Sequence, residues 1–357
     1  MISIVVPIYN TPEAFLRESL GNLDLPEDPR FEVCLIDDGS EDYVKEICME
    51  FVNANKNFKY YYQNNGGVSK ARNTGIFKSI GDWIIFVDPD DNFCIKRFLD
   101  SIEMIKFNGD IFFLGYETFI DQNIKINGYI ASNLIDIVEY ENVKKESKGY
   151  YLVEKLLKVS EDYSKNQGFY LGTPWAKIFR KQFLEENNLL FDEILRKRQD
   201  ALFCAKCYSL NPKVEVDRTD TIIYQYRIDN NDSITKKYNS KIKHIYLYLF
   251  QQMEIIIGNS NYKNTESLSL YAYDLTKELI NLDFCNVNNE KSFRIRKNDF
   301  ETFVNDKLIR DYLVKIKGGN MKVWKKILYK FISINNFYLI NLIFIGRKIR
   351  RGVRNFD

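Results

Sequence analysis

The sequence predicts an α/β fold in which a mostly parallel, Rossmann-like sheet is flanked by helices. Three short apolar runs, rich in β-branched residues, lie between residues 2 and 87 and lack the alternation of a half-exposed strand. Such runs are typical of strands that are covered on both faces. Helical patterns separate the runs, and strands that alternate with helices over short connections indicate a parallel sheet.

The expected elements follow one another in a regular order. The expected strands are Ile2–Ile8, Phe31–Ile36 and Ile84–Val87. The expected helices are Pro12–Leu23, Asp42–Asn53 and Ser69–Ser79. Polar residues come directly after each strand, and ligands bind outside the carboxyl ends of the strands in this class of fold. We therefore expect these polar residues to converge in space.

Three carboxylates, Asp88, Asp90 and Asp91, follow the third apolar run. Charges of one sign at the mouth of a buried strand repel one another unless a positive group lies among them. A Mg²⁺ or Mn²⁺ ion is the simplest such group, because aspartate supplies hard oxygen ligands and these ions keep positions for phosphates. The alternative is an acidic turn, since Pro and Asp are both favoured in turns.

Four motifs occur in order along the first third of the chain. They are Val6–Asn10, Asp37–Ser40, Gly67–Gly75 and Asp88–Asp91. In this order and spacing they resemble glycosyltransferase family 2. The resemblance implies a GT-A fold and an inverting enzyme with Mn²⁺ or Mg²⁺ as its cofactor. Such an enzyme moves a sugar from a nucleotide sugar, here expected to be a UDP-sugar, to a growing cell-surface glycan of the capsule, lipopolysaccharide or teichoic-acid type.

The resemblance also implies a nucleotide-sugar site at the strand ends. Its expected residues are Pro7, Tyr9, Asn10, Asp37, Asp38, Lys70, Arg72, Asp88 and Asp90. Asp38 is the chief candidate to bind a uracil imide, and an Asx turn is the alternative for one of the two aspartates of that motif. Tyr9 either stacks on the base or packs at the edge of the core. Arg72 is favoured over Lys70 as the ligand of the nucleotide or its phosphates.

The carboxylates of the fourth motif divide two further roles. By resemblance, Asp88 or Asp90 reaches the ribose hydroxyls, and Asp90 or Asp91 binds the metal. The sequence does not decide which of the two aspartates takes each role.

Asp200 is the candidate general base that takes the proton of the acceptor hydroxyl. The family has a Glu-Asp pair at the start of a helix, and the matching pair here is Gln199-Asp200. The alternative for Asp200 is an acidic residue favoured by the helix dipole. Trp175 and Lys177 are candidates to lie on the acceptor side of the site. The alternative for Trp175 is packing against the sheet. The alternative for Lys177 is a position on the solvated face of its strand.

Two regions are expected. Residues 1–238 form the catalytic domain, with a nucleotide-sugar-binding half at 1–115 and an acceptor-side half at 116–238. Residues 239–357 form a helical region, in which amphipathic patterns cover Ile242–Ile257, Ser267–Phe284 and Phe300–Ile316.

The tail at 322–354 mixes apolar and aromatic residues with lysine and arginine. Polar residues interrupt its apolar run too often for a membrane-spanning helix, but a basic amphipathic segment suits an anionic membrane surface. We expect peripheral membrane contact, which would suit an acceptor carried on a lipid. A helix packed on its own domain is the alternative.

Composition bounds the remaining function classes. The 51 Lys and Arg residues nearly balance the 49 Asp and Glu residues, so nothing indicates general nucleic-acid binding. The chain enters its first strand without a basic region or signal core, so we expect a cytoplasmic location. Membrane contact through the tail would place the protein at the inner face of the cell membrane. One alternative is a sugar-phosphate nucleotidyltransferase, although the Gly-rich phosphate loop expected after its first strand is missing. A noncatalytic polysaccharide-binding module of the same fold is the other.

Overall fold

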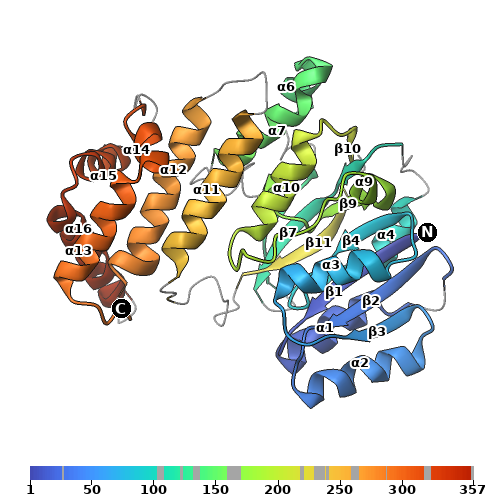
Figure 1. Ribbon diagram of the computed structural model, residues 1–357. Helices are drawn as coiled ribbons and strands as arrows, with labels where there is room; N and C mark the ends of the chain where they lie inside the picture. Colours follow the sequence, from blue (N-terminus) through green and yellow to red (C-terminus); the bar gives the residue numbers. More distant parts are fainter. Residues whose placement is uncertain are drawn as a thin grey trace. The chain divides into compact units, whose positions relative to one another are not determined.

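The computed structural model describes residues 1–25, 28–102, 108–120, 124–131, 137–158, 170–217, 221–228, 238, 241–258, 265–286, 288–316 and 323–354. The chain divides into two compact units. The first comprises residues 1–156 and 160–231, and the second comprises residues 157–159 and 232–357. Figure 1 traces the chain through both units.

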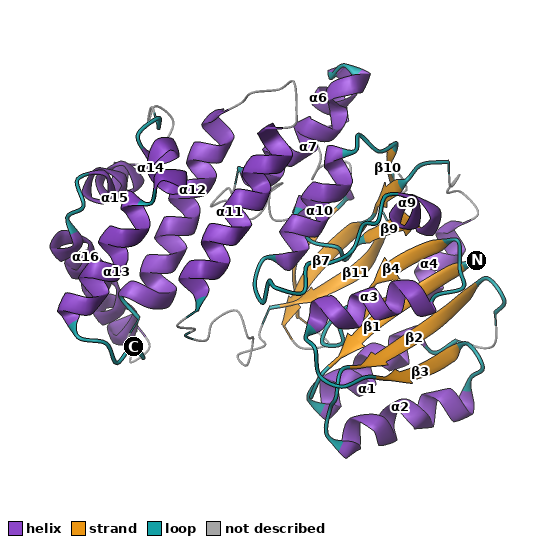
Figure 2. Cartoon of the chain, viewed as in Figure 1, coloured by secondary structure: helices purple, strands orange, loops and turns teal. Residues whose placement is uncertain are grey.

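The first unit is built on a seven-stranded sheet with the order β10-β6-β9-β4-β1-β2-β3 (Figure 2). Its strands are β1 (Ile2–Ile8), β2 (Phe31–Asp37), β3 (Phe58–Tyr62), β4 (Trp83–Phe86), β6 (Ile111–Phe113), β9 (Lys177–Arg180) and β10 (Val214–Val216). Strands β3, β2, β1 and β4 run parallel, whereas β9 is antiparallel to both of its neighbours. Because β1 and β2 are covered on both faces, every residue of these two strands is buried. The mostly parallel sheet expected from the sequence is confirmed.

Helices flank this sheet. They are α1 (Glu13–Leu23), α2 (Asp42–Ala54), α3 (Val68–Lys78), α4 (Ile95–Ile102), α6 (Ile137–Asn142), a 3-10 turn (Lys145–Ser147), α7 (Lys148–Leu157), α9 (Lys181–Glu186) and α10 (Gln199–Ser209). Helix α3 packs so closely on β1 that a Cβ atom at Gly75 would lie 2.2 Å from Cγ1 of Val5. A larger residue at Gly75 would push α3 away from the sheet and shift Arg72, which lies one turn earlier.

A second sheet has four strands in the order β5-β11-β7-β8. Its strands are β5 (Asn92–Phe93), β7 (Gly115–Ile120), β8 (Ile124–Tyr129) and β11 (Ile222–Arg227). Strand β11 is parallel to β7 and antiparallel to β5. The sequence did not predict this sheet. Because β5 directly follows Asp91, its pairing with β11 brings the end of β11 beside the Asp88–Asp91 segment.

The second unit is helical, which confirms the expected helical carboxyl-terminal region. Its elements are α11 (Ile242–Gly258), α12 (Thr265–Leu279), a π-helix (Ile280–Phe284), α13 (Phe293–Asn305), α14 (Lys307–Leu313), α15 (Val323–Ser333) and α16 (Phe337–Arg354). The single helix expected at Phe300–Ile316 is wrong, because the chain breaks at Asp306. The Asp306 carboxylate caps α14 by accepting a hydrogen bond from the Leu308 amide at 3.0 Å.

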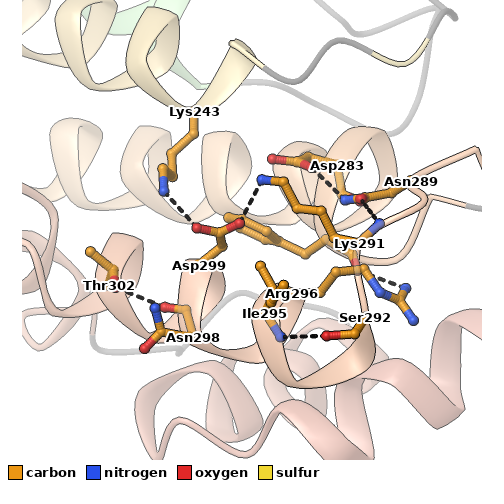
Figure 3. Close-up of polar contacts among 11 residues, drawn as sticks. Lys243, Asp283, Asn289, Lys291, Ser292, Ile295, Arg296, Asn298, Asp299 and Thr302 are labelled. Carbon is orange, nitrogen blue, oxygen red and sulfur yellow. Dashed lines mark hydrogen bonds and ion pairs between the residues drawn. The ribbon is translucent and has the colours of Figure 1, made fainter.

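A polar cluster joins α11, the π-helix and α13 within the second unit (Figure 3). The Asp299 carboxylate is paired with Lys243 at 3.0 Å and with Lys291 at 2.7 Å. The buried Asp283 carboxylate accepts a hydrogen bond from Nδ2 of Asn289 at 2.8 Å. The Lys243–Asp299 pair connects residues 56 apart in sequence, whereas the other two contacts are local, so this one pair ties α11 to α13.

Candidate active site

The polar segments after β1, β2 and β4 lie at one edge of the parallel sheet. Ile8 is the partner of Asp37 in the β1–β2 register, and Val5 is the partner of Phe86 in the β1–β4 register. The pairing between the β1 and β2 segments continues past the end of β2, where the Asp38 amide donates a hydrogen bond to the Ile8 carbonyl at 2.8 Å. The expected convergence of the three segments is confirmed.

Asn10 fixes the β1 loop against the β2 loop. Its backbone is left-handed with φ 46°, its amide donates to Oγ of Ser40 at 3.1 Å, and its Oδ1 accepts from the Glu41 amide at 2.8 Å. Pro7 is buried within β1, whereas Tyr9 is 49% exposed. About half of Tyr9 is open to solvent, so its ring is accessible for stacking, and a position at the edge of the core remains compatible with this exposure.

Asp37 and Asp38 are both buried but hold different segments. Asp37 accepts from the Ser40 amide at 2.9 Å and from the Tyr60 hydroxyl at 2.6 Å, so Asp37 makes the Asx turn that was the alternative for one of this pair. Asp38 accepts from the amides of Gly66 at 2.9 Å and Gly67 at 2.7 Å, and Gln63 Nε2 donates to it at 2.6 Å. Asp38 therefore fixes the glycine loop that leads into α3.

Arg72 on α3 joins two carboxylates from distant parts of the chain. Its side chain is only 3% exposed, and it is ion-paired with Asp88 at 2.7 Å and with Asp200. Its guanidinium also lies 5.1 Å from the ring centroid of Phe191. Arg72 thus brings the segment after β4 and the first turn of α10 to the same place, which the sequence order alone does not reveal.

Asp200 lies at the second position of α10 and remains 27% exposed. Burial raises the pKa of its carboxyl group above the ordinary value, although Arg72 favours the ionised form. A carboxylate with a raised pKa that still reaches solvent is a stronger proton acceptor than an ordinary aspartate. The side chain of Gln199, which precedes it, has a buried Oε1 atom that accepts no hydrogen bond from any residue that the structure describes.

Asp91 turns away from the edge and into the protein. It is 1% exposed, and its two oxygens accept hydrogen bonds from the Tyr224 hydroxyl at 2.6 Å and the Arg227 amide at 2.8 Å. Burial, together with the charges of Asp90 and Asp88, raises the pKa of the Asp91 carboxyl group. Asp88 and Asp90 are instead partly exposed. The three carboxylates are therefore not equivalent.

Arg227 at the end of β11 supports the same segment from behind. Its Nε donates to the Asp90 carbonyl at 2.9 Å, and its Nη2 is paired with Glu18 of α1 at 2.6 Å. Its guanidinium lies between the rings of Phe15 and Phe119, at 4.3 and 4.4 Å from their centroids. Sequence reasoning did not assign a role to Arg227 or Tyr224. The sequence hint to such a role was a charged or hydroxyl-bearing side chain within a largely apolar strand.

Arg196 is a third residue to which sequence reasoning assigned no role. Its Nη1 donates to the Gly66 carbonyl at 2.9 Å, and a Cβ atom at Gly67 would lie 1.7 Å from the same nitrogen. Gly67 also has a φ of +89°, which favours glycine. Lys70, one turn into α3, is half-buried and is not ion-paired with any residue that the structure describes.

Trp175 and Lys177 lie in the interior, which corrects the expectation that they face an acceptor. Trp175 is 3% exposed and stacks between the rings of Tyr224 and Tyr226. Lys177 is fully buried, and its Nζ donates to the carbonyls of Tyr170 at 2.6 Å and Thr173 at 2.7 Å. Burial lowers the pKa of Lys177 to about 7. In this arrangement packing is the role of Trp175, and neither side chain is open to solvent.

The acidic side chains do not by themselves complete a metal site. Across the described ranges of the chain, no group of three or more His, Cys, Asp or Glu side chains is arranged to hold a metal ion. Asp88 and Asp90 nevertheless offer hard oxygen atoms at the open edge of the sheet, and Mg²⁺ and Mn²⁺ commonly take their remaining ligands from phosphates and water.

The fold and this acidic edge define a GT-A protein. A crystal structure of residues 1–349 of TarS from S. aureus, in complex with UDP-GlcNAc, matches with a TM-score of 0.64 at 19% identity, covering 98% of this chain and 92% of that one. The model of the family described as Glycosyl transferase family 2 matches residues 3–186, more than half of the 357 residues. The chain therefore belongs to glycosyltransferase family 2, as its motifs predicted.

Curated relatives agree with this family. The glycosyltransferase GlyA of Streptococcus pneumoniae serotype 4 is 27% identical over 282 residues, which are 78% of this chain and 38% of that protein. The minor teichoic acid biosynthesis protein GgaA of Bacillus subtilis is 27% identical over 270 residues, which are 73% of this chain and 55% of that protein. The chain spans less than two thirds of either relative.

Proposed function

We propose that the chain is an inverting, metal-dependent glycosyltransferase that moves a sugar from a UDP-sugar to a hydroxyl of a cell-surface glycan. The observation that carries the proposal is the pairing of Arg72 with both Asp88 and Asp200. One guanidinium group therefore contacts both Asp88, which is proposed to bind the nucleotide-sugar donor, and Asp200, which is the proposed base. A direct displacement needs this proximity, because the leaving group and the attacking hydroxyl act on one carbon atom.

The uridine would lie over the first two strand ends. Two carboxylate oxygens accept about four hydrogen bonds, and Asp38 accepts three from the protein, so one acceptor position remains for a uracil imide. The exposed ring of Tyr9 is available for stacking on the base. The complex of TarS with UDP-GlcNAc supports a UDP-linked donor for a chain of the same fold.

The ribose and diphosphate would lie between α3 and the segment after β4. We assign Asp88 to the ribose, Arg72 and Lys70 to the diphosphate, and Asp90, with Asp88 nearby, to Mn²⁺ or Mg²⁺. Asp91 is the weaker metal candidate, since both of its oxygens already accept hydrogen bonds. A bound divalent cation would neutralise the negative charge that develops on the departing diphosphate.

The chemical step then needs one base from the protein. Asp200 accepts the proton of the acceptor hydroxyl while the hydroxyl oxygen attacks the anomeric carbon and the bond from that carbon to the diphosphate oxygen breaks. Attack opposite to the leaving group inverts the anomeric carbon, so an α-linked donor gives a β-glycoside. The name of GgaA supports a teichoic-acid type of acceptor, and a lipid-linked acceptor would place the tail at a membrane surface.

The test is a panel of nucleotide sugars incubated with the full chain. We expect release of UDP from one UDP-sugar in the presence of Mn²⁺ or Mg²⁺, and loss of that release on chelation. Release of pyrophosphate would indicate the alternative nucleotidyltransferase. Binding of a nucleotide sugar without turnover, with any acceptor tried, would indicate the alternative binding module.

A further inference from the structure

The last two helices carry an exposed apolar face. Its members are Val323, Ile327, Ile334, Tyr338, Leu339, Leu342 and Ile345, which are between 38% and 73% exposed. The spacing places these side chains on one side of each helix, and Ile334 lies in the turn between the two helices. On α15, Val323 and Ile327 are four residues apart, and on α16, Tyr338, Leu342 and Ile345 follow at intervals of four and three. We call these seven residues the α15–α16 face.

The opposite sides of the same helices pack within the second unit. Leu328 and Ile332 of α15 are buried, and so are Phe337, Ile340 and Phe344 of α16. The ring of Phe337 contacts Phe293 and Phe300 of α13, at 5.4 and 5.2 Å between centroids. The ring of Tyr338 also lies against Phe293, at 5.1 Å between centroids, so Tyr338 is partly accounted for by packing. The two helices are therefore held in place from one side, while Val323, Ile327, Leu342 and Ile345 remain exposed on the other.

The charge of these helices is of one sign. Between Val323 and Arg354 the sequence contains eight lysines and arginines and no aspartate or glutamate, while the whole chain is nearly balanced with 51 basic and 49 acidic residues. Lys326 and Lys330 are exposed and lie together on one side of Val323 and Ile327 on the helical wheel of α15. Five of the eight basic residues lie in the last two turns of α16 or just before them.

We infer that the α15–α16 face docks the protein on a membrane surface rich in anionic lipid. Exposed apolar side chains bordered by lysine, in a segment whose charged residues are all basic, are the pattern of helices that lie in the plane of a lipid interface. A symmetric contact between two copies through this face would bring together two segments whose charged residues are all basic, and repulsion between like charges disfavours self-association there. No helix in the described parts of the chain is long and apolar enough to cross a membrane, so the contact would be peripheral.

This inference extends the proposed function, because a transferase held at a lipid surface would meet an acceptor carried on a lipid. The proposed partner is the surface of a lipid bilayer, where phosphate-bearing headgroups meet the acyl chains. The basic residues supply attraction over a distance, and the apolar side chains supply the buried contact.

Sedimentation of the full chain with vesicles tests the inference. The wild type should bind vesicles of phosphatidylcholine containing phosphatidylglycerol and should not bind vesicles of phosphatidylcholine alone. The double variant Lys326→Glu with Lys330→Glu should weaken binding on the order of 30-fold or more, since each basic residue near the surface contributes about fivefold. The double variant Ile327→Ser with Leu342→Ser should weaken binding about tenfold for each side chain removed.

Matched controls separate the face from general charge and hydrophobicity. Lys45→Glu with Lys59→Glu makes the same charge change on exposed residues of the first unit, and Ile80→Ser removes a side chain that is 71% exposed there. Both should bind vesicles as the wild type does. Equal binding to neutral and anionic vesicles, or no loss of binding in the face variants, would overturn the inference. So would face variants that instead abolish a concentration-dependent dimer or the capture of an acidic protein.

The result is independent of catalysis. Asp200→Asn should bind vesicles normally although transfer is lost, and the two face variants should release UDP from a soluble UDP-sugar at the wild-type rate. Failure of the vesicle test with intact UDP release would therefore reject the membrane inference alone.

Discussion

Arg72 shows why single residues in this site cannot be understood one at a time. It is buried, and its two ion pairs join carboxylates that are 16 and 128 residues away in sequence. A buried arginine is stable only with such partners, so the site is organised around this charge before any ligand binds. Binding of a diphosphate would offer Arg72 a third anionic partner between the other two.

Replacement of Asp200 by asparagine tests the proposed base. The amide keeps the size of the side chain but accepts no proton, so transfer should fall by about 10²- to 10⁴-fold. Donor binding, measured by calorimetry with the UDP-sugar, should stay within a few-fold of the wild type. Gln199→Glu is the matched control, because it restores the family's usual pair and should leave transfer largely intact. A normal turnover number in Asp200→Asn would remove Asp200 from the mechanism.

The pH dependence of transfer follows from the same residue. Because burial raises the pKa of Asp200, the fraction of ionised base falls at a higher pH than for an ordinary aspartate. The rate at saturating substrates should therefore rise with pH through an acid limb that lies above about 4, the ordinary value for this side chain. The variant Asp200→Asn should lose this limb, whereas Gln199→Glu should retain it. An unchanged acid limb in Asp200→Asn would assign it to another group.

Asp90 and Asp91 should respond differently to substitution. Asp90→Asn should raise the Mn²⁺ concentration needed for half-maximal activity by about tenfold or more, because a charged ligand is lost, with little change in thermal stability. Asp91→Asn places an amide beside the Tyr224 hydroxyl and the Arg227 amide, and it should lower the free energy of unfolding by about 1–3 kcal/mol. If Asp91→Asn changes only the metal requirement, the two assignments must be exchanged.

Several elements could be predicted because their signals are local. Strands β1, β2 and β4 were expected at nearly their observed bounds, since a continuous apolar run between two helical patterns is typical of a strand in a parallel sheet. The second sheet could not be predicted, because β7 and β11 are short and about a hundred residues apart. The break at Asp306 had a local signal, an aspartate able to cap a helix, which the apolar periodicity concealed.

Within the site, the sequence located the loops but not the direction of each side chain. The Asp88–Asp91 motif is the same whether an aspartate faces solvent or turns inward, and the partners that turn Asp91 inward come from β11. Trp175 posed the same difficulty, because its burial depends on Tyr224 and Tyr226 of that strand. Residues whose roles depend on distant strands were therefore the ones that the sequence assigned incompletely.

The polar cluster of the second unit yields a prediction at the level of helices. Asp299→Asn should lower the free energy of unfolding by about 1–2 kcal/mol, because it weakens two partly buried hydrogen bonds from lysines. Glu301→Gln on the same helix is the control and should cost less than about 0.5 kcal/mol, since its pair with Lys297 is more exposed.

The sign of the pH effect on this cluster is fixed by the pKa of Asp299. Burial raises that pKa, but the hydrogen bonds from Lys291 and Lys243 lower it by more. The stability that Asp299 contributes is therefore present above its unfolded pKa and lost as pH falls through the lowered folded pKa. The difference between wild type and Asp299→Asn, measured by denaturant unfolding, should shrink in acid. A difference that grows in acid would contradict this assignment.

The molecule as a whole combines a family 2 glycosyltransferase unit with a helical unit whose last two helices are basic and carry exposed apolar side chains. The first unit carries every residue proposed to act on the donor. The second carries the surface proposed to meet a membrane. Each proposal can fail without the other, because vesicle binding needs no donor and UDP release needs no vesicle.

The most direct test of the central claim is a crystal structure of the full chain with UDP and Mn²⁺. We predict uracil against Asp38, the diphosphate beside Arg72, an anomalous peak for the ion within coordination distance of Asp90, and Asp200 facing the end of the diphosphate. Nucleotide bound away from this edge of the sheet, with no ion near Asp88 or Asp90, would contradict the account.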